Sequence, residues 1–126
     1  MFAQICKYVW GVSVYSLSEY AKILKVLGHP DRIRILRIIR EFGEVCVCEL
    51  VETLGIDFYS VSRNLKKLKF AGILKESRRG RFIFYSFLDL DSTKKNFIDC
   101  LLSVDDPAIS EDIERFKNVI KGKRSV

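Results

Sequence analysis

The sequence predicts a mostly α-helical winged helix-turn-helix domain with about six helices and a β-hairpin wing. Two short helical patterns are joined by a tight turn that contains Gly55, which is the spacing of a helix-turn-helix. A strand pattern with alternating side chains follows, folded back at Gly80. The basic residues concentrate over these two features. A chain of 126 residues suits one domain of this kind.

Two helices are expected before this unit. The first has apolar residues at helical spacing and a capping serine, Ser16 or Ser18. Its predicted inward positions are Tyr20, Ile23, Leu24 and Leu27. Pro30 opens the second helix at the position where a missing N–H costs least, and its apolar stripe runs from Ile33 to Ile39.

The helix-turn-helix itself is marked by local signals. A third helix is expected over Val47–Leu54, and Gly55 provides a left-handed stop. Asp57 is a good N-cap for a fourth helix, which reaches Ala71 and Gly72. The fourth helix is therefore predicted to be the recognition helix.

The wing and two further helices complete the predicted fold. Strands are expected over residues 73–77 and 81–87, with a basic tip between them. Asp91 or Ser92 caps a fifth helix, and Pro107 opens a sixth. We expect an N-terminal arm over residues 1–15, the folded domain over 16–120 and a flexible tail over 121–126.

The positive charge of the chain is confined to one stretch. Between Asp57 and Tyr85 lie eight basic and only two acidic residues, so this window accounts for the entire net charge of +6. A lysine-rich surface that serves only solubility has interspersed signs. The segregation favours double-stranded DNA as partner.

The predicted DNA contacts divide between the fourth helix and the wing. Small hydroxyls and an arginine early in the helix suit base edges, later lysines suit phosphates, and the wing arginines suit the adjacent minor groove. The candidates are Tyr59, Ser60, Ser62, Arg63, Lys66, Lys67, Arg78, Arg79 and Arg81.

Four cysteines are too few and too irregularly spaced for a secreted disulfide scaffold. No apolar run is long enough to span a bilayer, so the sequence predicts a cytoplasmic protein without a membrane partner. Cys46 and Cys48 stand at the start of the third helix, where thiolate, the metal-binding form, is favoured. Cys100 is instead expected to be a buried apolar residue.

Three stretches resemble the ArsR/SmtB family of metal-sensing winged-helix repressors: residues 27–36, residues 60–73 and residues 44–50. The last contains Cys46-Val47-Cys48, similar to the metal box of that family. The resemblance implies a homodimer held by its first and last helices, bound to operator DNA until metal binds. The family often has a histidine where Asn64 stands, and its arsenic-sensing box has a third cysteine at the position of Val51.

The resemblance also implies the ligand set. Its cadmium- and lead-sensing branch adds N-terminal cysteines across the dimer, which makes Cys6 the first candidate for a third ligand beside Cys46 and Cys48. Cys100 is the second candidate and His29 a distant third. Three sulfurs favour As(III) as effector, with Cd(II), Pb(II) and Zn(II) as alternatives.

Two other functions are alternatives to a metal-responsive repressor. One is a thiol-redox or reactive-sulfur sensor on the same fold, with Cys46 or Cys100 as the reactive thiol. The other is a thiol enzyme, which requires a base near the nucleophile; the single histidine, His29, lies in a proline turn. The sequence therefore predicts a protein that is not an enzyme.

Overall fold

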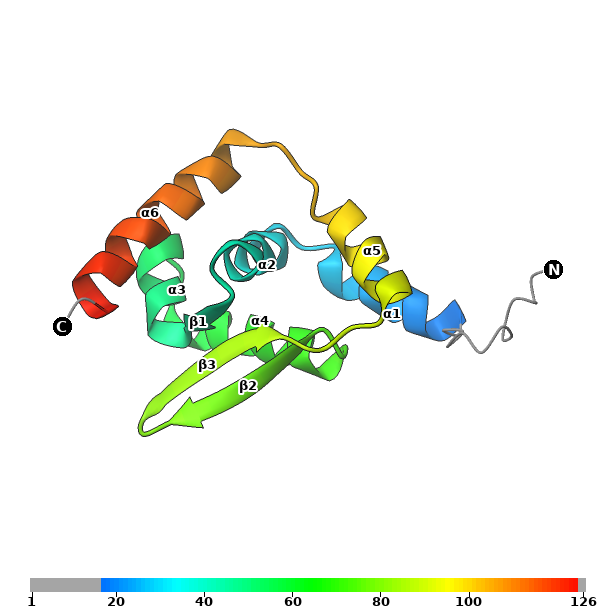
Figure 1. Ribbon diagram of the computed structural model, residues 1–126, viewed down its shortest axis with the longest axis horizontal. Helices are drawn as coiled ribbons and strands as arrows, with labels where there is room; N and C mark the ends of the chain where they lie inside the picture. Colours follow the sequence, from blue (N-terminus) through cyan, green and yellow to red (C-terminus); the bar gives the residue numbers. More distant parts are fainter. Residues whose placement is uncertain (1–16, 125–126) are drawn as a thin grey trace.

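The computed structural model describes residues 17–124, which form six helices and a three-stranded sheet (Figure 1). The elements in chain order are α1 (Leu17–Leu27), α2 (Pro30–Phe42), β1 (Glu44–Cys46), α3 (Val47–Leu54), α4 (Phe58–Phe70), β2 (Leu74–Arg79), β3 (Phe82–Phe87), α5 (Ser92–Leu101) and α6 (Pro107–Arg124). This arrangement confirms the predicted winged helix-turn-helix. None of the described helices is long and apolar enough to cross a bilayer.

The helix ends follow the local signals in the sequence. Gly55 ends α3 in the left-handed conformation, with φ of 67°. The Asp57 carboxylate accepts a hydrogen bond from the Ser60 backbone N–H at 3.0 Å, and so caps α4. His29 caps α2, because its Nδ1 accepts from the Asp31 N–H at 3.2 Å. That bond gives His29 a structural role at the start of α2.

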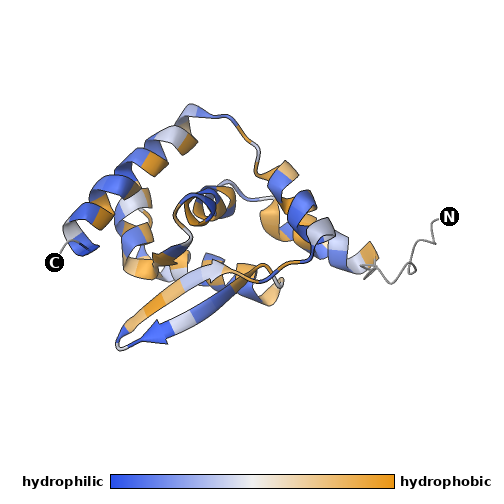
Figure 2. Cartoon of the chain, viewed as in Figure 1, coloured by the Kyte–Doolittle hydropathy of each residue, from blue (hydrophilic) through white to orange (hydrophobic). Residues whose placement is uncertain are grey.

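The sheet contains a strand that the sequence did not predict. Strand β1 pairs antiparallel with β3, so the order is β1-β3-β2 and Cys46 lies opposite Phe84. The wing strand β2 also continues to Arg79, two residues beyond its predicted end at Ser77. Only Gly80, with φ of 63°, and Arg81 remain as the connection. In Figure 2, β2 is hydrophilic and β3 is more hydrophobic.

The core forms around α2, which lies between the other helices in Figure 1. Its buried side chains are Ile35, Leu36, Ile38 and Ile39, all with no exposed surface. Helix α1 turns Ile23, Val26 and Leu27 inward, but Leu24 is 51% exposed. The prediction for Leu24 was wrong, because the face of α1 that carries it has no described element packed over it.

Helix α6 is anchored to the core by charge as well as by Phe116. The buried Asp112 carboxylate accepts two hydrogen bonds from Arg34 of α2, at 2.7 and 2.9 Å, and a third from Arg115. The helix continues to Arg124, into the stretch predicted as a flexible tail. The Arg124 guanidinium donates to the buried Glu49 carboxylate of α3, which holds the last turn in place.

Candidate nucleic-acid interface and cysteine pair

The predicted reading face of α4 is exposed. Tyr59 is 69% exposed, Arg63, Lys66 and Lys67 are also exposed, and the Arg63 guanidinium lies 5.3 Å from the centre of the Tyr59 ring. Ser62 is half-buried beside them. The helix therefore presents an aromatic ring and three cations to solvent on one surface.

Ser60 is occupied by the start of the helix. Its hydroxyl donates to the Asp57 carboxylate at 2.8 Å, in addition to the backbone bond. Hydrogen bonds from the Ser60 side chain and backbone hold the pKa of Asp57 below its usual value. Ser60 thus helps to cap α4 in this structure.

Asn64 stands where the resemblance suggested an altered base preference, and it faces inward. It is 8% exposed, and its side-chain oxygen accepts from Arg32 of α2 at 3.1 Å. The same guanidinium donates to the Val26 carbonyl of α1 at 3.1 Å. Asn64 therefore fixes α4 against α2.

The three wing arginines differ from one another. Arg78 and Arg81 are exposed, whereas Arg79 pairs with Glu44 of β1 and stacks on Phe84, 4.5 Å from the ring centre.

Sequence reasoning missed two exposed aromatic residues near the predicted contacts. Phe58, at the start of α4, is 59% exposed and Phe82 of the wing is 50% exposed. A large aromatic residue directly after the capping Asp57 was the available signal for Phe58.

Cys46 and Cys48 converge although they are two residues apart. Cys46 is the extended last residue of β1, with φ of −92° and ψ of 146°, and Cys48 lies in the first turn of α3. The change of backbone direction between them brings the two Sγ atoms to 3.2 Å. Cys46 is 3% exposed and Cys48 is half-buried.

The cysteine pair opens into a pocket of about 400 Å³ with charged walls. Arg79, Lys123 and Arg124 line it together with Glu44 and Glu49. Both carboxylates are committed, because Glu44 pairs with Arg79 and Glu49 with Arg124. Burial, together with the neighbouring Cys46, raises the pKa of the Cys48 thiol to about 11, so the prediction that the helix start favours thiolate was wrong for Cys48.

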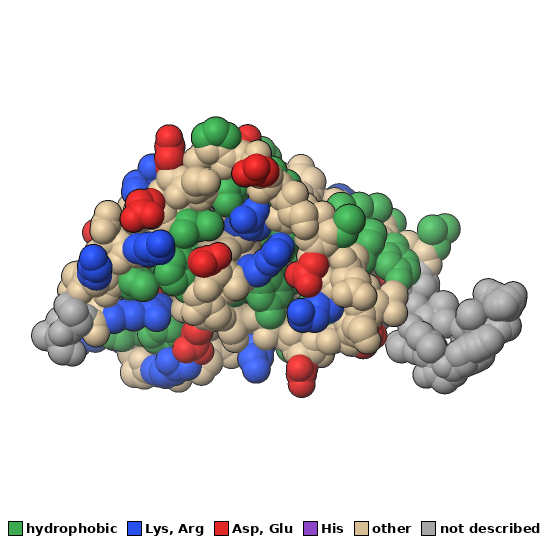
Figure 3. Space-filling model, turned by 45° about the horizontal axis from the view of Figure 1, so that its top comes forward, with side chains coloured by type: hydrophobic (Ala, Val, Ile, Leu, Met, Phe, Trp, Pro, Cys, Tyr) green, Lys and Arg blue, Asp and Glu red, His purple; other side chains and the backbone are tan. Residues whose placement is uncertain are grey.

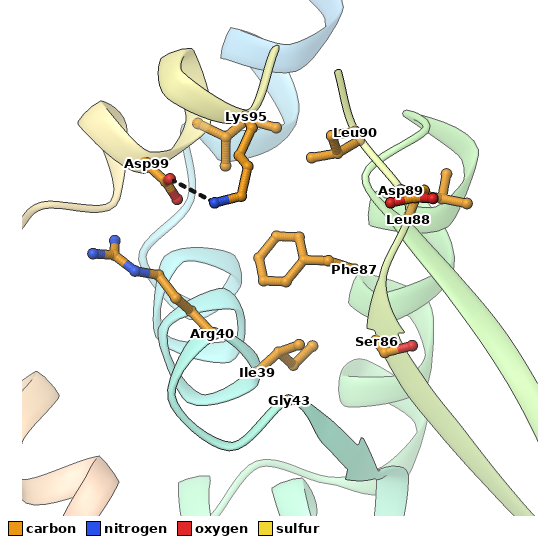
Figure 4. A pocket seen from close by; sticks show the side chains of 11 residues that line it. Ile39, Arg40, Gly43, Ser86, Phe87, Leu88, Asp89, Leu90, Lys95 and Asp99 are labelled. Atoms are coloured by element: carbon orange, nitrogen blue, oxygen red, sulfur yellow. Dashed lines mark ion pairs between the residues drawn. The ribbon is translucent and has the colours of Figure 1, made fainter. Parts of the chain in front are cut away.

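A second pocket, of about 480 Å³, lies between α2, the end of β3 and α5 (Figure 4). The Phe87 ring points into it, and Ile39 and Leu90 add apolar surface. Lys95 pairs with Asp99 at its rim. Its lining contains neither cysteine nor histidine, so this pocket is separate from the thiol chemistry.

A family model described as bacterial regulatory protein, arsR family, matches residues 29–76. The uncharacterized HTH-type transcriptional regulator MJ1325 of Methanocaldococcus jannaschii is 38% identical over 69 residues, covering 55% of this chain and 78% of that protein. The chain belongs to the arsR family of regulators. This confirms the resemblance found in the sequence and the expected class, a DNA-binding regulator.

Two further comparisons extend this result. The arsenic resistance transcriptional regulator ArsR1 of Pseudomonas putida is 38% identical over 63 residues, covering 50% of this chain and 49% of ArsR1. The chain thus spans about half the length of ArsR1. The solution structure of the homodimeric winged helix-turn-helix domain of Mycobacterium bovis Mb0332 is similar in fold, with a TM-score of 0.59 at 22% identity. It covers 73% of this chain and 90% of that one.

The ligand set predicted from the sequence lies only partly inside the described residues. Within 17–124, no cluster of three histidine, cysteine or acidic side chains is present that would hold a metal ion. Cys100 was predicted to be buried, but it is exposed, because it lies on the outer face of α5 while Ile98 faces the core. It does not join the cysteine pair. Cys6, the preferred third ligand, lies outside the described residues.

Proposed function

We propose that this arsR-family protein is a homodimeric repressor that leaves its operator DNA when As(III) binds the thiols of Cys46 and Cys48. The observation that carries the proposal is the 3.2 Å separation of the two Sγ atoms at the first turn of α3. Helix α3 is the first helix of the helix-turn-helix, so a ligand on this pair acts directly on the element that positions α4.

The proposed DNA surface is the outer face of α4 together with the wing. Support comes from the exposure of Tyr59, Arg63 and Lys66 on one face and from the charge of +6 gathered between Asp57 and Tyr85. Ser62, Lys67 and the wing arginines complete the proposed contacts. Arg78 and Arg81 are the wing residues best placed for phosphate, because Arg79 is engaged by Glu44.

The charges around the cysteine pair favour As(III) over divalent ions. At neutral pH arsenious acid is uncharged, whereas Cd(II), Pb(II) and Zn(II) must enter a pocket lined by Arg79, Lys123 and Arg124. The two carboxylates that would attract a cation are each paired with an arginine. Two thiols supply part of the three-sulfur set that As(III) prefers, and we propose Cys6 as the third ligand. The similarity to ArsR1, which is described as an arsenic resistance transcriptional regulator, supports As(III) as the effector.

The route from the thiols to the DNA surface is short. Cys46 is paired with Phe84 of the wing strand β3, and Glu44 of the same β1 strand holds Arg79 of β2. A change at the start of α3 therefore alters both the helix-turn-helix and the base of the wing. A coupling of about 1–3 kcal/mol, which is usual for allosteric proteins, weakens DNA binding about 5- to 150-fold.

Dimerisation is proposed through α1 and α6, the first and last helices, as the resemblance implies. Leu17 is 87% exposed and Leu24 is 51% exposed on α1, which leaves apolar surface for a second copy. Figure 3 shows hydrophobic side chains gathered at the end of the molecule where α1 begins. The homodimeric M. bovis domain of the same fold supports this arrangement.

A second candidate function is thiol-redox sensing. The Sγ atoms at 3.2 Å need to approach by about 1.2 Å to form a disulfide bond. In that reaction an oxidant such as peroxide takes two electrons from the thiols, two protons leave and the S–S bond forms. DNA release would then follow peroxide in place of As(III).

The test is fluorescence anisotropy of a duplex selected by the protein from a random-sequence library, titrated separately with As(III), Cd(II) and peroxide. We expect As(III) to release the wild type, and the variant with Cys46→Ser and Cys48→Ser to remain bound with unchanged starting affinity. Cys100→Ser is the matched control and should respond as the wild type does. Cys6→Ser tests the proposed third ligand and should lower sensitivity to As(III).

The outcomes separate the candidates. Release of the double serine variant by As(III) would place the sensor elsewhere in the chain. Release of the wild type by peroxide alone would favour the redox function. Failure of the protein to select any duplex would reject the DNA-binding function itself.

A further inference from the structure

A groove of about 430 Å³ beside the recognition helix is lined by cations from three helices. Lys22 and Lys25 come from α1, Arg32 from α2 and Lys67 from the end of α4. No acidic side chain is among the described residues that line it. Phe70, which is 80% exposed, forms an apolar part of the wall.

The composition of this groove points to an anionic ligand. Like charges gathered on one surface repel each other, and that cost is offset when an anion binds. Lys22 and Lys25 are both exposed, and neither makes an ion pair with any residue in the described part of the chain. On the face of the molecule that Figure 3 shows, basic and acidic groups alternate.

The groove is built rigidly onto the recognition helix. Arg32 donates from Nε to Asn64 of α4 and from Nη1 to the Val26 carbonyl of α1, at 3.1 Å in both cases. The two bonds hold α1 and α4 at a set distance, which places Lys22 and Lys25 beside Lys67. Lys67 belongs to both surfaces, so the groove is continuous with the exposed basic face of α4.

We propose that this basic groove holds the sugar-phosphate backbone of the operator beside the major groove that α4 enters. Lys22 and Lys25 each neutralise one phosphate, and Phe70 lies against the sugar. The inference rests on the proposed DNA-binding function and extends its contact surface to α1. A backbone contact of this kind carries affinity and orientation but no base preference.

The experiment compares the salt dependence of DNA binding in two double variants. Lys22→Ala with Lys25→Ala removes the groove lysines, and Lys117→Ala with Lys121→Ala removes two exposed lysines from α6, which lies far from α1 in Figure 1. Alanine is the best helix former, so both variants are expected to fold, as checked by circular dichroism. Affinity for the selected duplex is measured over a series of potassium chloride concentrations.

Each phosphate contact contributes about 0.9 to the slope of log affinity against log salt, so the groove variant should lose about 2 units of slope per bound protomer. The α6 variant should keep the wild-type slope. Discrimination between the selected duplex and a scrambled one should be unchanged in the groove variant.

Four results would overturn the inference. Equal slopes for the groove variant and the wild type would reject the groove while leaving the DNA-binding function intact. Equal losses in both variants would show a general effect of net charge. A groove variant that keeps the wild-type slope but is no longer stabilised against heat by inorganic phosphate would identify a site for small anions. A wild type that binds no duplex would reject both the groove and the proposed function.

Discussion

The two thiols of the pair differ in their exposure to solvent. Cys46, the last residue of β1, is buried, whereas Cys48 is half-buried; both line the pocket. Because burial and the neighbouring Cys46 raise the pKa of Cys48 to about 11, this thiol carries its proton at neutral pH. The proton balance of ligand binding therefore depends on the chemical form in which the effector arrives.

This difference gives a pH test at the residue scale. Arsenious acid brings hydroxyl groups that leave as water with the thiol protons, so binding releases no net proton. Cd(II) must displace the Cys48 proton into solution, and thiolate increases as pH rises toward 11. Between about pH 6.5 and 8.5, the Cd(II) concentration for half-release should fall at least about tenfold per pH unit, because the Cys48 proton alone accounts for one factor of ten and protons displaced from the other ligand thiols add to it. The As(III) concentration should stay constant.

The measurement is the same anisotropy titration, with the affinity of the ligand-free protein for DNA determined at each pH as the control. A pH dependence that is equal for As(III) and Cd(II) would contradict the protonated state of Cys48.

At the scale of elements, the two sides of α4 have different surroundings, the core on one side and solvent on the other. Its inner side packs Val61, Leu65 and Leu68 into the core, and Asn64 bonds to Arg32. Its outer side presents Arg63 to solvent. Because Arg63 contributes nothing to the core, its removal should affect DNA binding with little change in folding.

Arg63→Ala is therefore expected to weaken binding to the selected duplex about 5- to 150-fold, as for loss of one base or phosphate contact worth about 1–3 kcal/mol. Lys117→Ala removes the same charge from α6, where Lys117 lies 3.8 Å from Glu114, and should change affinity less than twofold or so. Thermal denaturation checks that both variants are folded. Equal losses of affinity would place the reading face away from α4.

At the scale of the whole molecule, α1 presents an exposed apolar surface. Its inner face packs on α2, and Tyr20 meets Phe97 of α5 edge to face with ring centres 5.2 Å apart. Its outer face carries Leu17 and Leu24, both exposed. A second copy that covers this face would set the spacing of the two α4 helices on DNA.

Leu24→Glu should convert a dimer into a monomer, because it places a charge in an apolar interface. Multi-angle light scattering measures the mass against the 14.6 kDa of one chain. Leu88→Glu is the control, since Leu88 is an exposed leucine at the end of the wing, 38% exposed, outside α1 and α6. A wild type that is monomeric at all concentrations, or a dimer that persists in Leu24→Glu, would remove α1 from the interface.

Much of the fold and part of the candidate site were predictable because their signals are local. Gly55, Asp57 and Pro30 mark helix ends through the backbone of their own turn, and each acts in the structure as its residue type predicts. The basic window and the Cys46-Val47-Cys48 motif were also visible in the sequence. These signals determined the class of domain and the regions to inspect.

Other features depend on partners that are distant in the chain. Strand β1 exists because Glu44–Cys46 pairs with β3, about 40 residues away, and that pairing turns Cys46 toward Cys48. The exposure of Cys100 and the inward position of Asn64 depend on which face of a helix meets the core. The groove lysines Lys22 and Lys25 belong to a part of the chain without net charge.

The sequence by itself thus determined the winged helix-turn-helix, its caps and its charged segment, since these follow from residue types and spacing within a few turns. Only the tertiary structure decided the cysteine geometry, the commitment of Arg79 to Glu44 and the basic groove between α1 and α4. The physical reason is that packing and strand pairing bring together groups whose separation along the chain carries no local signal.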